Sequence, residues 1–510
     1  MSPGLIGGPL GCLGVAMLLA GAGPRMRVTG LVFVGAGCAI LGAEIAPAPH
    51  RTAVALGVAA AVLASVPVGF LLRRRPWILA FAILPCVPAR IPFTLAGSQS
   101  QLELPLYILA SAAGVQIVLE TLAGDRRKRE LGPIAFPLAG FVLWTGLSLL
   151  WSDDVRAGSF ELIAYFLPFS VIGVAIARLE WSRRAMRWLL IELVGLALVF
   201  AGIGVYQYTT RNLFWNPKVK IGNAYEPFYR VNSVFWDPSI YGRFLMIAIV
   251  AALVVVMRGE SKRVALACAL ALTGIWVGLV LSYSQSSFAG LIVAVVLLMA
   301  VVWRRVAVVA AGFVAVLLVS TGVANPNIQN AFLKRSSVAL NRATSDRAGL
   351  IYNGIRIAID NPVVGVGVGG FRHHYAELTG LKGKEPKKAA SHDSPVTVAA
   401  ENGAVGLVLF AWVLIAAFLA LARAGGDAFQ RRTNLAVALC LAAIGVHSLF
   451  YDHLFEDPTT WALLGLAGLG LAAGKVESVR GLVEPGSSRP VHPQRHTAAR
   501  LGRVGAGQAG

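Results

Sequence analysis

The sequence predicts an all-α fold: a polytopic transmembrane helical bundle of about 15 membrane helices, with a large outer-face loop containing short helices. Three observations lead to this fold class. The 510 residues are 56% hydrophobic and only 14% charged, and their mean hydropathy is +0.69. A water-soluble chain of this length is far more polar. The protein therefore needs a lipid bilayer as its solvent.

Apolar runs of about 20 residues recur along the whole chain, and this is the length that a helix needs to cross roughly 30 Å of hydrocarbon. The predicted membrane helices cover residues 3–21, 27–46, 52–72, 76–94, 104–119, 132–151, 159–178, 187–207, 239–257, 264–281, 286–303, 305–323, 396–421, 433–450 and 459–474. A cleaved signal peptide is the alternative for the first run. No basic segment precedes that run, and a second apolar run follows almost at once. We therefore predict that the first run is a membrane helix.

Positive charge marks every second predicted loop, and short basic loops stay in the cytoplasm. The clusters are Arg25 and Arg27, Arg73–Arg75, Arg126–Arg129, Arg183–Arg187, Arg258–Arg263, Arg304 and Arg305, Arg423–Arg432, and the tail from Lys475. All of them fall on one face. We therefore expect a multi-pass protein of the cell membrane, with its N-terminus outside and its C-terminus in the cytoplasm. The net charge of +20 follows from this topology, and no nucleic-acid partner is expected.

Two loops on the predicted outer side are too long to be simple connections. They divide the chain into N-terminal transmembrane helices (1–210), a basic outer loop (211–238), further transmembrane helices (239–323), a large outer-face catalytic loop (324–395), C-terminal transmembrane helices (396–474) and a disordered cytoplasmic tail (475–510). The basic outer loop breaks the charge rule. Contact with lipid headgroups would explain its cations, and so would an anionic ligand.

A helix start follows the large outer loop. His392, Asp393, Ser394 and Pro395 precede a long apolar run. Ser394 suits the N-cap and Pro395 the first helical position, which puts His392 and Asp393 at the positive end of the helix dipole. Unpaired amides at such an end favour a phosphate, and a neutral imidazole there can act as a general base. A loop histidine without a role is the alternative.

Charged residues lie on both sides of this helix start. Glu401 is about two turns into the apolar helix, where a lone carboxylate costs about 2.5 to 3.5 kcal/mol and needs a partner. We favour a supporting role for it over a catalytic one. Upstream, helical spacing over 345–360 puts Arg356 on the solvated face. It puts one apolar stripe along the other face, made of Arg347, Ile351, Gly354, Ile355 and Ala358. Arg347 either reaches the lipid headgroups or binds a pyrophosphate with its planar guanidinium.

A glycine-rich segment, NPVVGVGVGGF at 361–371, connects these regions. No helical pattern of the dinucleotide-binding type follows it, so it is not a dinucleotide-binding fingerprint. Gly365 and Gly367 are expected to allow tight turns, and close approach to a ligand is the other possibility. His373 and His374 have no Cys or acidic residue at metal spacing, so we expect no metal site.

Together these residues resemble the O-antigen ligase and Wzy-type polymerase superfamily of outer-face glycosyltransferases. The matching motif positions are Arg347, Pro362, Gly365, Gly367, Phe371, His392, Glu401, Gly403 and Gly406. Segments 230–243 (RVNSVFWDPSIYGR) and 281–287 (LSYSQSS) are also similar to the family. Two positions depart from it. Gln285 stands where an arginine is common, and Asp393 stands where asparagine is usual.

The resemblance implies a metal-independent, inverting glycosyltransferase without a cofactor. Its donor would be an undecaprenyl-diphosphate-linked glycan and its acceptor the hydroxyl of a glycan or lipid, on the outer face and among membrane lipids. His392 and Arg347 would be catalytic. The resemblance assigns diphosphate binding to Arg230, Arg243 and Gln285, and supporting roles to Glu401, Asp393, Gly365 and Gly367.

Two other functions remain open. A polysaccharide polymerase of the same superfamily would use the same donor and differ in its acceptor. A transporter or flippase of lipid-linked sugars would use the same cations for guidance rather than for chemistry. Transporters usually contain internal repeats, and we find no convincing repeat between the two halves of this sequence.

Overall fold

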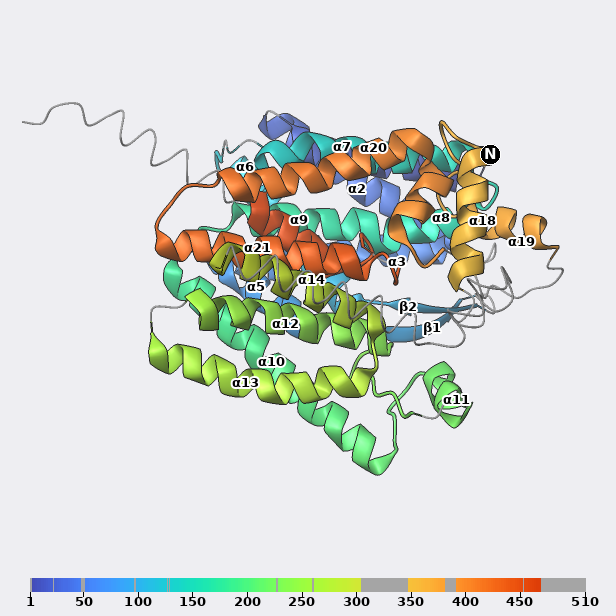
Figure 1. Cartoon of the computed structure of the whole chain (residues 1–510). Coiled ribbons are helices and arrows are strands. Elements are labelled where there is room, and N and C mark those ends of the chain that lie inside the picture. Colours follow the sequence, from blue (N-terminus) through green and yellow to red (C-terminus); the bar gives the residue numbers. More distant parts are fainter. Residues whose placement is uncertain are drawn as a thin grey trace, which may run out of the picture.

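The computed structural model describes residues 2–21, 23–46, 51–95, 98–125, 127, 129–225, 228–258, 261–303, 347–380, 391–452 and 454–468. Within these ranges almost the whole chain is helical, and the helices run side by side along a common direction (Figure 1). The predicted helix 305–323, the first part of the large loop, the lysine-rich stretch 382–388 and the tail from 475 lie outside the described residues.

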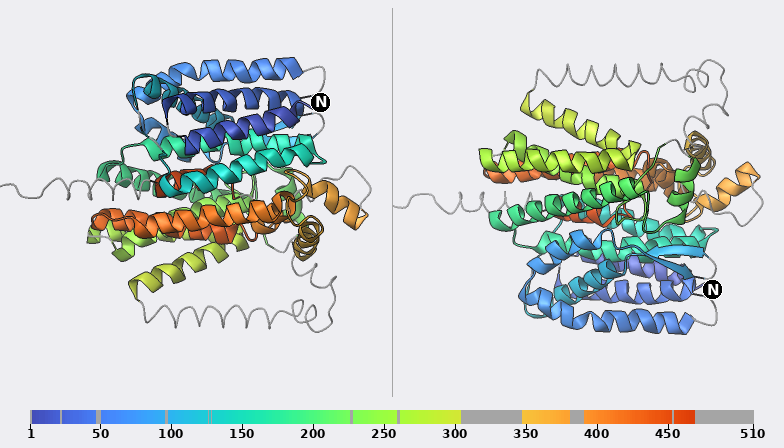
Figure 2. Two further views of the ribbon diagram at one scale, coloured as in Figure 1. Left: turned by 90° about the horizontal axis from the view of Figure 1, so that it is seen from above. Right: turned by 90° about the horizontal axis from the view of Figure 1, so that it is seen from below.

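The chain runs back and forth between the two ends of the bundle. Its N-terminal half contains α1 (Gly4–Ala20), α2 (Pro24–Ile45), α3 (Arg51–Ala64), α4 (Val66–Arg74), α5 (Trp77–Cys86), α6 (Leu104–Leu122), α7 (Ala135–Ser148), α8 (Val155–Glu161), a π-helical turn (Leu162–Phe166), α9 (Leu167–Arg178) and α10 (Arg183–Thr210). The rest contains α11 (Pro217–Tyr225), α12 (Pro238–Arg258), α13 (Lys262–Ser282), α14 (Gln285–Val302), α18 (Arg347–Asp360), α19 (Phe371–Thr379), α20 (Ser394–Arg423), α21 (Ala428–His447) and a helix over 458–468. Figure 2 shows the first helices on one side of the bundle and α12 to α14 on the other, with α20 and α21 between them.

Nine helices in the described part of the chain are long and apolar enough to cross a membrane, and α1 and α5 are apolar but shorter. The expectation of a multi-pass, helical membrane protein is therefore confirmed. The total of about 15 membrane helices and the side that each terminus faces stay predictions.

Polar contacts show that several basic loops share one end of the bundle. Arg183 pairs with Asp427 at 2.5 Å, which joins the start of α10 to the turn between α20 and α21. Arg432 donates a hydrogen bond to the carbonyl of Arg258 at 2.8 Å, which adds the end of α12. We name this the basic end. The opposite end, where α11, α18 and α19 lie (Figure 1), is named the site end.

The predicted helix 76–94 extends too far along the chain. α5 ends at Cys86, directly after Pro85, and a hairpin follows in which β1 (Ile91–Leu95) pairs antiparallel with β2 (Ser98–Leu102). A proline inside a helix removes a backbone hydrogen bond, and the β-branched and aromatic residues of β1 suit a strand. The hairpin lies at the site end (Figure 1).

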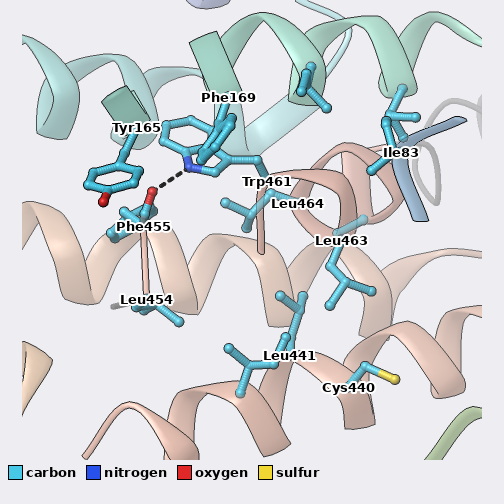
Figure 3. Packing of buried hydrophobic residues seen from close by; sticks show 14 of the residues in the cluster. Ile83, Tyr165, Phe169, Cys440, Leu441, Leu454, Phe455, Trp461, Leu463 and Leu464 are labelled. Atoms are coloured by element: carbon cyan, nitrogen blue, oxygen red, sulfur yellow. Dashed lines mark hydrogen bonds between the residues drawn. The ribbon is translucent and has the colours of Figure 1, made fainter. Parts of the chain in front are cut away.

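An aromatic cluster forms the centre of the core. The ring centroid of Phe455 lies 4.9 Å from the ring centroid of Phe141 and 5.6 Å from that of Trp461. The indole of Trp461 is fully buried and donates to the carbonyl of Phe455 at 2.8 Å (Figure 3). A buried indole N–H needs such a partner. The core therefore fixes the segment between α21 and the last described helix.

The helix α20 is interrupted at Gly403. Gly403 has φ +64° and ψ −165°, a conformation that only glycine adopts readily. A Cβ atom at Gly403 would lie 2.3 Å from the carbonyl oxygen of Val363. The interruption of α20 is therefore a point of close backbone contact with the glycine-rich segment 361–370.

The glycine-rich segment replaces the hydrogen bonds that α20 loses at its break. The amides of Val366 and Gly367 donate to the carbonyls of Ala400 and Glu401, at 2.9 and 2.8 Å. In return the amide of Ala404 donates to the carbonyl of Pro362 at 2.9 Å. Backbone groups in an apolar bundle must be paired in this way, because water is absent there.

Replacing Gly403 with Ala should lower the free energy of unfolding by at least about 2 kcal/mol, since it strains the backbone and crowds Val363. Gly445→Ala is the matched control, because Gly445 is inside α21 with nothing within 4 Å of its added Cβ. The control should be neutral or stabilising by up to about 1 kcal/mol. Thermal unfolding of the purified protein in detergent measures both, and equal stability of the two variants would contradict the proposed strain.

Candidate functional site

The start of α20 is capped by Asp393 rather than by Ser394, so the predicted cap is one residue late. The Asp393 carboxylate accepts the amide of Val396 at 2.9 Å, and Pro395 occupies the first turn. His392 directly precedes the cap and has φ +61°, the left-handed conformation that is uncommon outside glycine. The cap and this turn place His392 just outside the first turn of α20.

The side chain of Asp452, a residue that the sequence analysis did not identify, binds the first turn of α20. Its carboxylate accepts hydrogen bonds from the hydroxyls of Ser394 at 2.8 Å and Thr397 at 2.5 Å. The Ser391 hydroxyl donates to the carbonyl of Asp393 at 2.7 Å and lies 2.9 Å from the hydroxyl of Thr397. The turn that carries His392 is therefore fixed on both sides by side-chain hydrogen bonds.

The sequence does carry a signal for Asp452. The stretch 451–458 reads YDHLFEDP, so it places several carboxylates between two apolar runs. Acidic residues are costly in such a position unless they have partners. This cost could have identified Asp452 and Asp457 as members of a polar network.

α18, which begins at Arg347, packs on this helix start. Its buried face consists of Leu350, Gly354 and Ile357. A Cβ at Gly354 would lie 2.7 Å from a methyl of Val396, so α18 packs closely on the first turns of α20. Arg347 lies three residues before Leu350, so it continues this face at the N-terminal end of α18. It is half-buried, whereas Arg356 is exposed. The predicted apolar stripe included Ile355, which is 45% exposed and therefore does not belong to it.

Arg347 and Arg230 lie close enough for their charges to interact. Burial lowers the pKa of Arg347, and the neighbouring guanidinium of Arg230 lowers it further, while Asp237 and Tyr451 act in the opposite direction. An arginine remains charged despite such shifts. In the described part of the chain, no carboxylate forms an ion pair with either guanidinium. The pair therefore gives the site end a concentrated positive charge.

Arg230 is held where α13 meets α14. Its Nε donates to the carbonyl of Ser282 at 3.3 Å, at the C-terminal end of α13. Its backbone N–H and C=O bond the side-chain amide of Asn223 in α11, at 3.0 and 2.9 Å. Gln285 is exposed at the first position of α14, three residues after Ser282. The structure thus places Gln285 in the neighbourhood of Arg230.

Arg243 has a different environment from the other predicted diphosphate ligands. It is 2% exposed, and its Nε pairs with Asp457 at 2.5 Å. Its charge is therefore matched inside the protein, and a buried pair of this kind is costly to break. This contact indicates a structural role for Arg243, in joining α12 to the segment before the last described helix.

Glu401 and the two glycines connect the break in α20 to α19. The carboxylate of Glu401 is buried and accepts the amide of Phe371 at 3.3 Å, at the first residue of α19. Gly365 has φ +70° and lies against the backbone of Glu401, and Gly367 has φ +84° and lies against Ser148. These three residues determine where the glycine-rich segment and α19 sit.

His373 and His374 lie on α19 beside acidic residues. His373 is 3.3 Å from Glu377, and His374 is 3.5 Å from Glu377 and from Asp153. Among the described residues, no group of three or more His, Cys, Asp and Glu side chains is arranged to hold a metal ion.

The fold and the site define a multi-pass membrane protein with a cationic, histidine-bearing site at one end of its helical bundle. Residues 266–411 match the family model described as O-antigen ligase. This segment is therefore similar to the O-antigen ligase family, as its motifs predicted, and that family acts on lipid-linked glycans in polysaccharide biosynthesis. The matched segment includes His392 and Arg347 and begins after Arg230. Comparison with curated proteins gives no match.

The cap of α20 can be tested through Asp393. Asp393→Ala should cost about 1 kcal/mol, while Asp393→Asn should keep the cap, because Asn and Asp cap equally well. Burial raises the pKa of Asp393 against the opposing bond from the Val396 amide. The folded protein therefore binds this proton at higher pH than the unfolded chain does.

This linkage has a definite sign. The stability of the unmodified protein relative to Asp393→Asn should rise as the pH falls from neutral through the folded-state pKa of Asp393. Unfolding midpoints measured across that pH range for the protein and both variants give the comparison. A stability difference that is flat with pH would contradict the raised pKa.

Proposed function

We propose that the chain is an O-antigen ligase-like, inverting glycosyltransferase that moves a glycan from an undecaprenyl-diphosphate carrier to an acceptor hydroxyl on the outer face of the membrane. The observation that carries this proposal is that Arg347 lies within electrostatic range of Arg230, on a helix that packs on the first turns of α20. Two neighbouring guanidiniums without a carboxylate partner among the described residues suit a diphosphate, which carries at least two negative charges.

In the proposed reaction His392 accepts the proton of the acceptor hydroxyl. The hydroxyl oxygen then attacks the anomeric carbon from the side opposite the diphosphate, and the bond from that carbon to the diphosphate oxygen breaks. The electron pair leaves with the undecaprenyl diphosphate, whose growing charge Arg347 and Arg230 stabilise. The chain supplies the positive charge that the step needs, so the proposal includes no metal ion.

The other residues have supporting roles in this proposal. Asp393 and Asp452 hold the turn that carries His392, through the hydrogen bonds of Asp393 to Val396 and of Asp452 to Ser394. Glu401, Gly365 and Gly367 fix α19 and the glycine-rich segment. Gln285 would hydrogen-bond a phosphate oxygen, although as a neutral amide it cannot offset charge.

Arg347→Ala and Arg230→Ala should each lower the transfer rate by roughly 100-fold or more, because each removes one cation from the diphosphate. Arg356→Ala is the matched control, since Arg356 lies on the exposed face of the same helix. Membranes that contain the lipid-linked glycan and an acceptor, assayed for new glycosidic product, measure the rates. If Arg356→Ala were as inactive as Arg347→Ala, a specific diphosphate contact would be excluded.

His392→Ala should reduce transfer by about 100-fold to 10,000-fold, the usual contribution of a general base. A separate measurement of binding to the lipid-linked glycan should show that the donor still binds, because the two arginines are unchanged. Full activity of this variant would remove the proposed mechanism. Movement of the lipid-linked sugar across vesicle membranes without any new glycosidic bond would favour a transporter instead.

A further inference from the structure

An open cleft of about 700 Å³ lies where α4 ends and α5 begins. Two cations form its rim and apolar side chains form its wall. The lining residues are Arg74, Arg75, Pro76, Trp77, Ile78, Phe81 and Ala82. The cleft therefore offers two different surfaces to one ligand.

The cleft belongs to the basic end of the bundle. The ring of Trp77 packs edge-on against Trp181, with centroids 5.2 Å apart and an interplanar angle of 84°. Trp181 is two residues before Arg183, which pairs with Asp427 in the turn between α20 and α21. The cleft is thus at the level where the helices end, far along the bundle from the proposed diphosphate site.

The two rim arginines differ from other arginines at this end. Arg27 and Arg178 are buried and bind Glu130 at 2.7 and 2.5 Å. Arg74 and Arg75 are exposed, and no carboxylate in the described ranges forms an ion pair with them. Their charge at the rim is consequently open to an anion from outside the protein.

The wall of the cleft comes from one short apolar helix. Trp77, Ile78 and Phe81 are half-buried and face the cleft, while Leu79 is fully buried and anchors α5 in the core. Trp77 is held by its contact with Trp181. Aromatic residues of this kind are enriched where a membrane meets water, and basic residues there attract anionic headgroups.

We propose that this cleft binds an anionic phospholipid of the surrounding bilayer. The lipid phosphate lies on Arg74 and Arg75, and an acyl chain lies along Trp77, Ile78 and Phe81. A soluble phosphate would use only the rim, whereas a lipid uses the rim and the apolar wall together. This site is separate from the proposed glycosyl transfer and does not depend on it.

The test uses the full-length protein, purified in detergent and titrated with phosphatidylglycerol or with phosphatidylcholine while thermal unfolding is followed. Phosphatidylglycerol should raise the unfolding midpoint and phosphatidylcholine should not. Arg74→Gln combined with Arg75→Gln should weaken the apparent affinity for phosphatidylglycerol roughly 30-fold, since each cation near a membrane surface contributes about 1 kcal/mol.

Two control variants keep the test specific. Arg73→Gln removes a neighbouring exposed arginine that does not line the cleft, so its response to phosphatidylglycerol should match that of the unmodified protein. Arg74→Lys combined with Arg75→Lys keeps the charge and should retain most of the affinity. An equal loss in the Arg73 variant and the double glutamine variant would overturn the site. An equal midpoint shift with glycerol phosphate would overturn the lipid assignment.

Discussion

The geometry of the site depends on one exchange of backbone hydrogen bonds, between the broken helix α20 and the glycine-rich segment. A helix interrupted inside an apolar bundle leaves amides and carbonyls without partners, at a cost of several kcal/mol each. Here Val366, Gly367 and Pro362 replace those partners. The same contacts fix the position of α19 relative to α20 and the orientation of the first turns of α20. The turn that carries His392 is held separately, by the hydrogen bonds of Ser391, Asp393 and Asp452.

The site is assembled from segments that are far apart in the sequence. Arg230 precedes α12, Arg347 begins α18, His392 precedes α20, and Asp452 follows α21. Close packing at Gly354 brings α18 against α20, and the carboxylate of Asp452 ties the turn after α21 to the same helix start. The nearness of Arg347 and Arg230 comes from this packing, since the two residues are far apart in the sequence. Other buried arginines are matched by acidic partners, such as Arg27 and Arg178 by Glu130 and Arg90 by Glu103.

Much of the fold and part of the site could be predicted. Hydropathy predicted the multi-pass helical architecture, because an apolar run of sufficient length has few other stable forms. The helix start at 393–395 followed from local capping chemistry, although the cap itself is Asp393 and not Ser394. The hairpin at 91–102 was missed, because a short apolar run does not distinguish a strand from a helix. The buried stripe of α18 was predicted one position away from Leu350 and Ile357, which shows the limit of periodicity in a short helix.

The sequence by itself determined that the protein is a helical membrane protein and that one segment of it is similar to the O-antigen ligase family, since both properties reside in local residue patterns. Only the tertiary structure decided how the individual charges are used. Arg243 and Arg347 look alike in the sequence, yet Arg243 forms an ion pair with Asp457 and Arg347 lies within electrostatic range of the guanidinium of Arg230. The physical reason is that the state of a buried charge depends on the partner that the fold brings to it, and that partner is distant along the chain.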